Sequence, residues 1–144
     1  QICAFCIMIN HYHLMFRTRK DTDVATVRQY MHGGTSRKYF FLRSRPQKAF
    51  WGTQKIINVR NEEMYWKIVG YICGNLLKHK ELGTFEELAE SPFSSYGYFS
   101  KKYGGDFMRE VVYRVIDVGE GAEGEVDIEG LELSKLKTLP RARD

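Results

Sequence analysis

Residues 4–16 constrain the fold of this chain most, because they are almost entirely apolar up to a pair of histidines. The apolar residues fill both alternating sets of positions, which predicts a central β-strand covered on both faces. With a strand period of two, His11 and His13 point to one face with Cα atoms about 6.6 Å apart. Two imidazoles at that spacing are able to converge on one metal ion. The alternative is a pair of buried histidines with a structural role.

Charge is distributed unevenly along the sequence. The chain has 144 residues and a formal net charge of +4, but residues 1–60 carry 11 Lys or Arg and only two acids. Residues 61–144 carry 11 Lys or Arg and 16 Asp or Glu. A basic half around the His-x-His pair predicts a polyanionic ligand such as a nucleic acid. A generic solvated surface is the alternative.

Composition and length limit the class of protein. The length predicts a single domain, and no apolar run approaches the roughly 18 residues of a membrane span. The cysteines Cys3, Cys6 and Cys73 are odd in number and sparse, which predicts a reducing cytosol. In a strand Cys3 and Cys6 face opposite sides, so they do not chelate together. The chain begins at Gln1 with strand-like residues, which we interpret as a chain whose preceding elements are missing.

The segment between the histidines and residue 60 combines basic and aromatic side chains. We expect a helix capped at residues 21–23 and ended by Gly33 and Gly34, a second helical piece over 36–43, and a strand over 50–59. Basic residues interleaved with aromatics suit phosphate contacts and base stacking. Trp51 is expected in the core, with base stacking as the alternative.

The strongest predicted helix runs over residues 61–79. Its apolar residues fill an arc of about 140°. Tyr71 and Asn75 are four apart and share a face at the edge of this arc, with Lys67 and Lys78 flanking them on the polar side. A catalytic side chain needs such a place between core and solvent, although Tyr71 is equally well explained as a packing residue.

The remaining chain predicts smaller elements. We expect a capped helical turn over 84–88, a turn over 91–96 and a helix over 106–116. Residues 117–132 hold seven acids, four glycines and no Lys or Arg, which is typical of a mobile acidic tail.

These side chains suggest a chemistry for phosphodiesters. Two histidines and an amide oxygen are able to hold Mg²⁺ or Mn²⁺ when a bound phosphate supplies further oxygens. The metal polarises the scissile phosphate, and a nearby tyrosine attacks phosphorus to form a covalent phosphotyrosine link. Such a link keeps the phosphodiester energy, so strand joining follows cleavage without a nucleotide cofactor.

Three motifs of the chain resemble, in the same order, those of the single-tyrosine HUH transposases of the IS200-like type, including the REP-associated tyrosine transposases. The family pattern Met-Pro-Asn-His-hydrophobic-His-Leu is matched by Met-Ile-Asn-His-Tyr-His-Leu at residues 8–14. The family segment Tyr-Ile-x-x-Asn-Pro is matched at residues 71–76, with Leu in place of Pro, and a Ser-Ser-Tyr turn is matched at residues 94–96. The resemblance covers roughly residues 3–100.

The resemblance implies metal-dependent cleavage and strand transfer of single-stranded, hairpin-containing DNA by a transposase in a prokaryotic cytoplasm. It implies His11, His13 and Asn75 as ligands of Mg²⁺ or Mn²⁺ and Tyr71 as the nucleophile. The implied fold is α+β and ferredoxin-like (RRM-like), with helices packed on an antiparallel sheet, in residues 1–103. Residues 104–144 then form a C-terminal helix and the acidic tail. We expect DNA contacts from Arg17, Arg19, Lys20, Arg28, Arg37, Lys38, Arg43, Arg45, Lys67 and Lys78.

Two departures from the family pattern bear on these expectations. Ile9 and Leu76 replace the prolines of the two motifs, and the strand and helix that precede the histidine motif in the family are lacking. An N-terminally truncated member or a decaying gene copy is consistent with this. The rival functions are a nucleic-acid-binding module without catalysis and a zinc hydrolase that uses His11 and His13. The choice between a monomer and a homodimer stays open.

Overall fold

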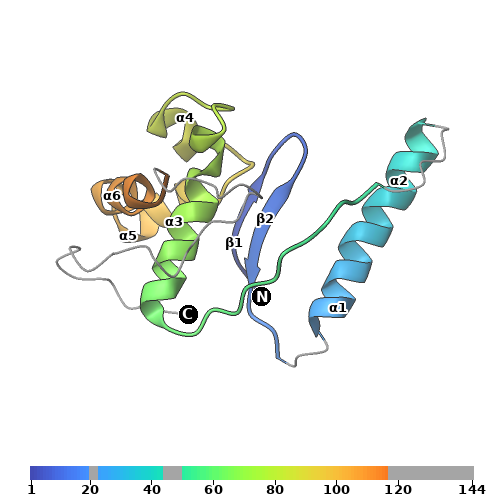
Figure 1. Ribbon diagram of the computed structural model, residues 1–144. Coiled ribbons are helices and arrows are strands. Elements are labelled where there is room, and N and C mark those ends of the chain that lie inside the picture. The colour runs from blue at the N-terminus through green and yellow to red at the C-terminus, as the bar shows by residue number, and fades with distance from the viewer. Residues whose placement is uncertain (20–22, 44–49, 117–144) are drawn as a thin grey trace. The chain divides into compact units, whose positions relative to one another are not determined.

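The computed structural model describes residues 1–19, 23–43 and 50–116 (Figure 1). Compactness divides the chain into two units. The first unit consists of Gln1 and Arg17–Asn58, and the second consists of Ile2–Phe16 and the chain from Val59 onward. Each unit has its own elements and is described by itself.

The second unit begins with a β-hairpin in place of the predicted single strand. Strand β1 (Ile2–Ile7) pairs antiparallel with β2 (Tyr12–Phe16), and Cys6 lies opposite His13. The expectation of one strand running through both histidines is wrong, because the backbone N–H of Met8 donates to the carbonyl of His11 at 2.9 Å and closes a turn. Asn10 sits in that turn, where its short polar side chain is favoured.

One face of the hairpin contributes to the hydrophobic core. Ala4, Cys6 and Met15 belong to the hydrophobic core, and the hairpin packs on the long helix α3 (Glu62–Lys78). The outer edge of β1 pairs with the loop at residues 93–95, because Ile7 N–H donates to the Phe93 carbonyl at 2.8 Å. The predicted covering of both faces of this strand is not found, because Phe5 is only half-buried and Ile7 is exposed.

Helix α3 confirms the strongest helical prediction. The side chain of Asn61 accepts from the N–H of Met64 at 2.8 Å and caps its first turn, where Glu62 and Glu63 suit the helix dipole. Trp66 is fully buried on its core face.

Three further helices complete the second unit: α4 (Phe85–Glu90), α5 (Tyr96–Tyr103) and α6 (Gly105–Ile116). Thr84 and Glu87 form the predicted capping box of α4, and α6 confirms the predicted C-terminal helix. The turn predicted at 91–96 leads into α5, which the sequence pattern did not indicate. Helix α6 packs against α3, so it belongs to the same compact unit as the histidine hairpin.

The first unit is built on an unbroken helical run. It comprises α1 (Asp23–Arg28), the π-helical turn η1 (Gln29–Gly33) and α2 (Gly34–Arg43). The predicted break at the glycine pair is wrong. Gly33 ends the π-helical turn η1, and Gly34, with a helical φ of −62°, begins α2 directly. The strand predicted over residues 50–59 is also wrong, because this described stretch contains no strand.

The prediction of an α+β fold is confirmed, but only two strands are found in the described residues. The ferredoxin-like arrangement is therefore not established by this sheet. No helix within the described ranges is long and apolar enough to cross a membrane. The predicted acidic tail, Lys20 and Arg45 lie outside the described residues.

Candidate functional site

The hairpin and helix α3 bring the motif residues together in the second unit. The ring centroids of His11 and His13 are 5.2 Å apart, and those of His13 and Tyr71 are 5.1 Å apart, both with edge-to-face geometry. All three side chains are half-buried. The histidine motif and the Tyr71 segment therefore meet at one place in the second unit.

The tautomer of His11 is set by its neighbour. Nδ1 of His11 lies 2.6 Å from Oδ1 of Asn10, and an amide oxygen only accepts, so Nδ1 carries the proton. In the neutral ring the lone pair is then on Nε2. A hydrogen bond of this kind orients a histidine for metal ligation.

Asn75 lies one helical turn after Tyr71 and is fully buried. Its Nδ2 donates to the backbone carbonyl of Tyr71 at 2.5 Å. Its Oδ1 is buried and has no hydrogen-bond partner among the described residues. A buried acceptor without a donor costs about 1–3 kcal/mol, so this oxygen is available to a partner from outside the described residues.

Two further side chains of α3 and its C-terminus join the cluster. The ring of His79 lies 5.3 Å from that of His11, and Nζ of Lys78 lies 5.4 Å from the centroid of Tyr71. The sequence analysis does not include His79 among the site residues. Its spacing of four from Asn75 and eight from Tyr71 was the signal that places all three on one helix face.

The two motifs offer two imidazoles and one amide oxygen to a metal ion. No three His, Cys, Asp or Glu side chains of the described ranges are grouped as metal ligands. The oxygen that the motifs add to His11 and His13 is the buried Oδ1 of Asn75. Burial raises the pKa of Cys6 to about 11 and that of Cys73 to about 12, so neither supplies a thiolate at neutral pH.

Most of the predicted DNA-contacting cations lie in the first unit. They are exposed on the loop after β2 and on the helical run: Arg17, Arg19, Arg28, Arg37, Lys38 and Arg43. Lys67 differs from the expectation, because it is only 7% exposed and its Nζ lies 3.0 Å from a carboxylate oxygen of Glu63. The amphipathic pattern placed Lys67 on the polar face, but its long side chain folds back along the helix to reach Glu63.

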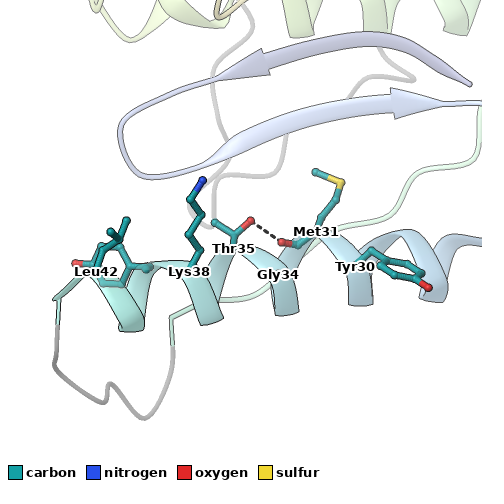
Figure 2. Close-up of a pocket in the computed structure, with 7 residues that line it drawn as sticks. Tyr30, Met31, Gly34, Thr35, Lys38 and Leu42 are labelled. Atoms are coloured by element: carbon teal, nitrogen blue, oxygen red, sulfur yellow. Dashed lines mark hydrogen bonds between the residues drawn. The ribbon is translucent and has the colours of Figure 1, made fainter.

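The first unit also carries an aromatic surface. Trp51, expected in the core, is half-buried and stacks on His32 with 4.3 Å between ring centroids, while its Nε1 donates to the His32 carbonyl. Burial and the nearby Arg28 lower the pKa of His32. A shallow hollow of about 450 Å³ lies along the helical run over Gly34 (Figure 2). Its lining comprises Tyr30, Met31, Gly34, Thr35, Lys38, Tyr39 and Leu42.

Comparison with protein-family models, curated proteins and solved structures finds no match for this chain. The function proposed below therefore depends on the motifs in the sequence and on the contacts between the hairpin and α3.

Proposed function

We propose that the chain is a metal-dependent DNA endonuclease and strand transferase of the single-tyrosine HUH type, acting as a transposase on single-stranded DNA. The observation that carries this proposal is the 5.1 Å contact between the ring of His13, from the first motif, and that of Tyr71, from the second. A histidine ligand beside a tyrosine nucleophile is the pairing that this chemistry needs.

The proposed metal ligands are His11, His13 and Asn75. Their fit to Mg²⁺ or Mn²⁺ is supported by the histidine rings 5.2 Å apart and by the buried Oδ1 of Asn75, which no described donor satisfies. When bound, the cation supplies electrophilic polarisation of the scissile phosphate. The protein contributes the orientation of the two imidazoles, through the Asn10 bond and through the pairing of β2 with β1.

Tyr71 is the proposed nucleophile. Its phenolic oxygen forms a bond to phosphorus as the bond from phosphorus to the leaving deoxyribose oxygen breaks. The tyrosine loses one proton and the leaving oxygen gains one, so the step is balanced. Reversal with a different deoxyribose hydroxyl joins a new strand. Lys78, whose Nζ lies 5.4 Å from the ring centroid, provides positive charge beside the phosphotyrosine.

The proposed substrate is supported by the charge of the first unit. Its exposed cations, together with the Trp51–His32 stack, suit the phosphates and bases of an unpaired strand. A cytoplasmic, DNA-associated location and hairpin-containing DNA are part of this proposal. A measurement of molecular mass in solution decides between a monomer and a homodimer.

A covalent-adduct assay tests the proposed activity. Labelled single-stranded DNA from the regions flanking the gene is mixed with the protein and Mn²⁺ or Mg²⁺, and the products are separated on a denaturing gel. We expect a shifted band that disappears with chelator, with His13→Ala and with Tyr71→Phe. Tyr98→Phe is the matched control, because Tyr98 is 61% exposed and also has a lysine over its ring.

The same assay separates the alternative function. A nucleic-acid-binding module binds this DNA in native gels and forms no covalent band with either metal. That result, obtained with protein that is folded by circular dichroism, would contradict the proposed catalysis.

A further inference from the structure

The C-terminus of α3 reverses the chain through a residue with left-handed backbone. Lys80 has a φ of +58°, a region that ordinarily favours glycine. The backbone N–H groups of Glu81 and Leu82 then donate to the carbonyl of Leu76 at 2.9 and 3.1 Å. This reversal satisfies the last carbonyls of the helix and directs Glu81 back along α3.

The side chain of Glu81 reaches the histidine turn. Its Oε1 accepts a hydrogen bond from the backbone N–H of Ile9 at 3.3 Å. Ile9 lies inside the turn that Met8 and His11 close, and the ring of His11 contacts that of His79 at the end of α3. Two contacts therefore connect the turn that carries His11 to the helix that carries Tyr71 and Asn75.

This connection is specific to a chain without proline at position 9. The motif of the resembling family has proline there, and proline has no N–H to donate. In this chain Ile9 supplies the donor and Glu81 supplies the acceptor. Without a proline ring, the turn has more conformational freedom. The hydrogen bond between Ile9 and Glu81 reduces that freedom.

We propose that Glu81 is a positioning residue that holds the His11 turn in register with the Tyr71–Asn75 face of α3. This inference rests on the proposed function, since the ligands it aligns are those of the proposed metal site. Ligands from two separate elements converge only if the elements keep their relative position. Small displacements in such a site are costly.

The test measures Mn²⁺ binding to the full chain by electron paramagnetic resonance, with dimethyl phosphate present to supply the phosphate oxygens that the proposed site requires. We expect Glu81→Ala to weaken Mn²⁺ affinity about tenfold, as loss of an outer-shell contact does. Glu81→Gln keeps an oxygen acceptor for Ile9 and should stay within about threefold of wild type. Glu90→Ala, an exposed acid on α4, is the matched control for loss of charge and should leave the affinity unchanged.

A double-mutant cycle separates the hydrogen bond from the charge of Glu81. In an Ile9→Pro background the donor is gone, so Glu81→Ala should have no further effect on Mn²⁺ affinity. An undiminished tenfold effect in that background, or an equal loss in Glu81→Gln, would overturn the proposal.

Hydrogen exchange at the Ile9 amide reports on the same contact without metal. We expect Glu81→Ala to accelerate this exchange, and Glu81→Gln to slow it again. If wild type binds no Mn²⁺ but Ile9 exchange depends on Glu81, the proposed function fails while the restraint on the turn stands. If wild type binds Mn²⁺ and Glu81→Ala changes neither affinity nor exchange, the positioning role fails while the proposed function stands.

Discussion

At the scale of single residues, Asn75 connects stability to the proposed activity. It is fully buried within α3, and its Oδ1 has no donor among the described residues. Such an atom lowers the stability of the fold, and a bound cation would provide what it lacks. A purely structural asparagine would be expected to satisfy both ends of its amide.

Replacing Asn75 by leucine should therefore separate binding from folding. Asn75→Leu removes the unsatisfied acceptor, so we expect the free energy of unfolding to be unchanged or higher by about 1 kcal/mol. Mn²⁺ binding should be lost. Urea denaturation and electron paramagnetic resonance measure the two quantities.

Asn61→Leu is the matched control in the same helix. Asn61 caps α3 through the N–H of Met64, so its loss should lower the free energy of unfolding by about 1 kcal/mol and leave Mn²⁺ binding intact. A large loss of stability in Asn75→Leu would contradict the ligand role and mark Asn75 as a packing residue.

The three cysteines test the orientation of β1. Burial raises the pKa of the Cys6 and Cys73 thiols, and both are fully buried, whereas Cys3 is only partly buried beside the core. Because the pKa values of these two thiols are raised, little of either thiol is ionised at pH 8. We expect iodoacetamide to modify Cys3 alone in native protein and all three after unfolding, as read by mass spectrometry. Cys6 reacting as fast as Cys3 would contradict the hairpin orientation.

The sequence was informative about residues whose chemistry and spacing are local. His11, His13, Tyr71 and Asn75 were singled out from two motifs. The structure brings the rings of His11, His13 and Tyr71 into contact and places Asn75 one helical turn after Tyr71. Glu81 was not anticipated, because its role depends on a left-handed residue and on a contact across 72 positions. No local pattern contains that information.

At the scale of elements, the site depends on how closely α3 approaches α6. A Cβ added to Gly70 would lie 2.8 Å from both Cγ1 and the backbone carbonyl oxygen of Val111. Glycine is therefore required at this crossing, immediately before Tyr71. The packing of α6 against α3 therefore bears on the position of the neighbouring Tyr71, the proposed nucleophile.

Gly70→Ala should lower the free energy of unfolding by about 1–3 kcal/mol, because a backbone atom has to move to admit the methyl group. Gly34→Ala in α2 is the matched control. Its added Cβ meets nothing within 4 Å, so a gain of about 0.5–1 kcal/mol is expected from helix propensity. Urea unfolding followed by circular dichroism measures both, and equal effects would contradict the close crossing.

Elements were predictable where the pattern is local. The helix over residues 61–79 and the capped turn at Thr84 depend on neighbouring residues, and both are confirmed. Burial on α3 extends beyond the predicted apolar arc, because Asn75, expected at the boundary with solvent, is fully buried. The strand expected at residues 50–59 was not found, because a strand forms only with a backbone partner that its own residues do not specify. The hairpin turn was missed because Met8 and Ile9 continue the apolar run of β1, and Asn10 alone does not mark a turn as clearly as a glycine or proline would.

At the scale of the whole molecule, charge distinguishes the two units. The described first unit carries exposed arginines and lysines, whereas the chain from residue 61 onward is acidic on balance. This asymmetry was predictable from the sequence. The α+β class was predictable as well. The extent of the predicted antiparallel sheet was not, and the described residues contain two strands of it.

We expect the first unit to provide the salt-dependent part of DNA binding. Each phosphate contact contributes a slope of about −0.7 to the logarithm of the single-stranded DNA affinity against the logarithm of salt concentration. Arg37→Ala should reduce the slope by about 0.7, whereas Lys101→Ala, an exposed cation of α5, should leave it unchanged. Fluorescence anisotropy measures both. Equal reductions would contradict a localised DNA surface.

The position of the covalent attachment on the protein tests directly whether Tyr71 is the nucleophile. The chain has nine tyrosines, so the position of a nucleotide adduct is informative. The protein–DNA adduct is digested with nuclease and protease and analysed by tandem mass spectrometry. We expect a nucleotide phosphate on Tyr71, formed only with Mn²⁺ or Mg²⁺. An adduct on another tyrosine, or none while the same DNA is bound, would contradict it.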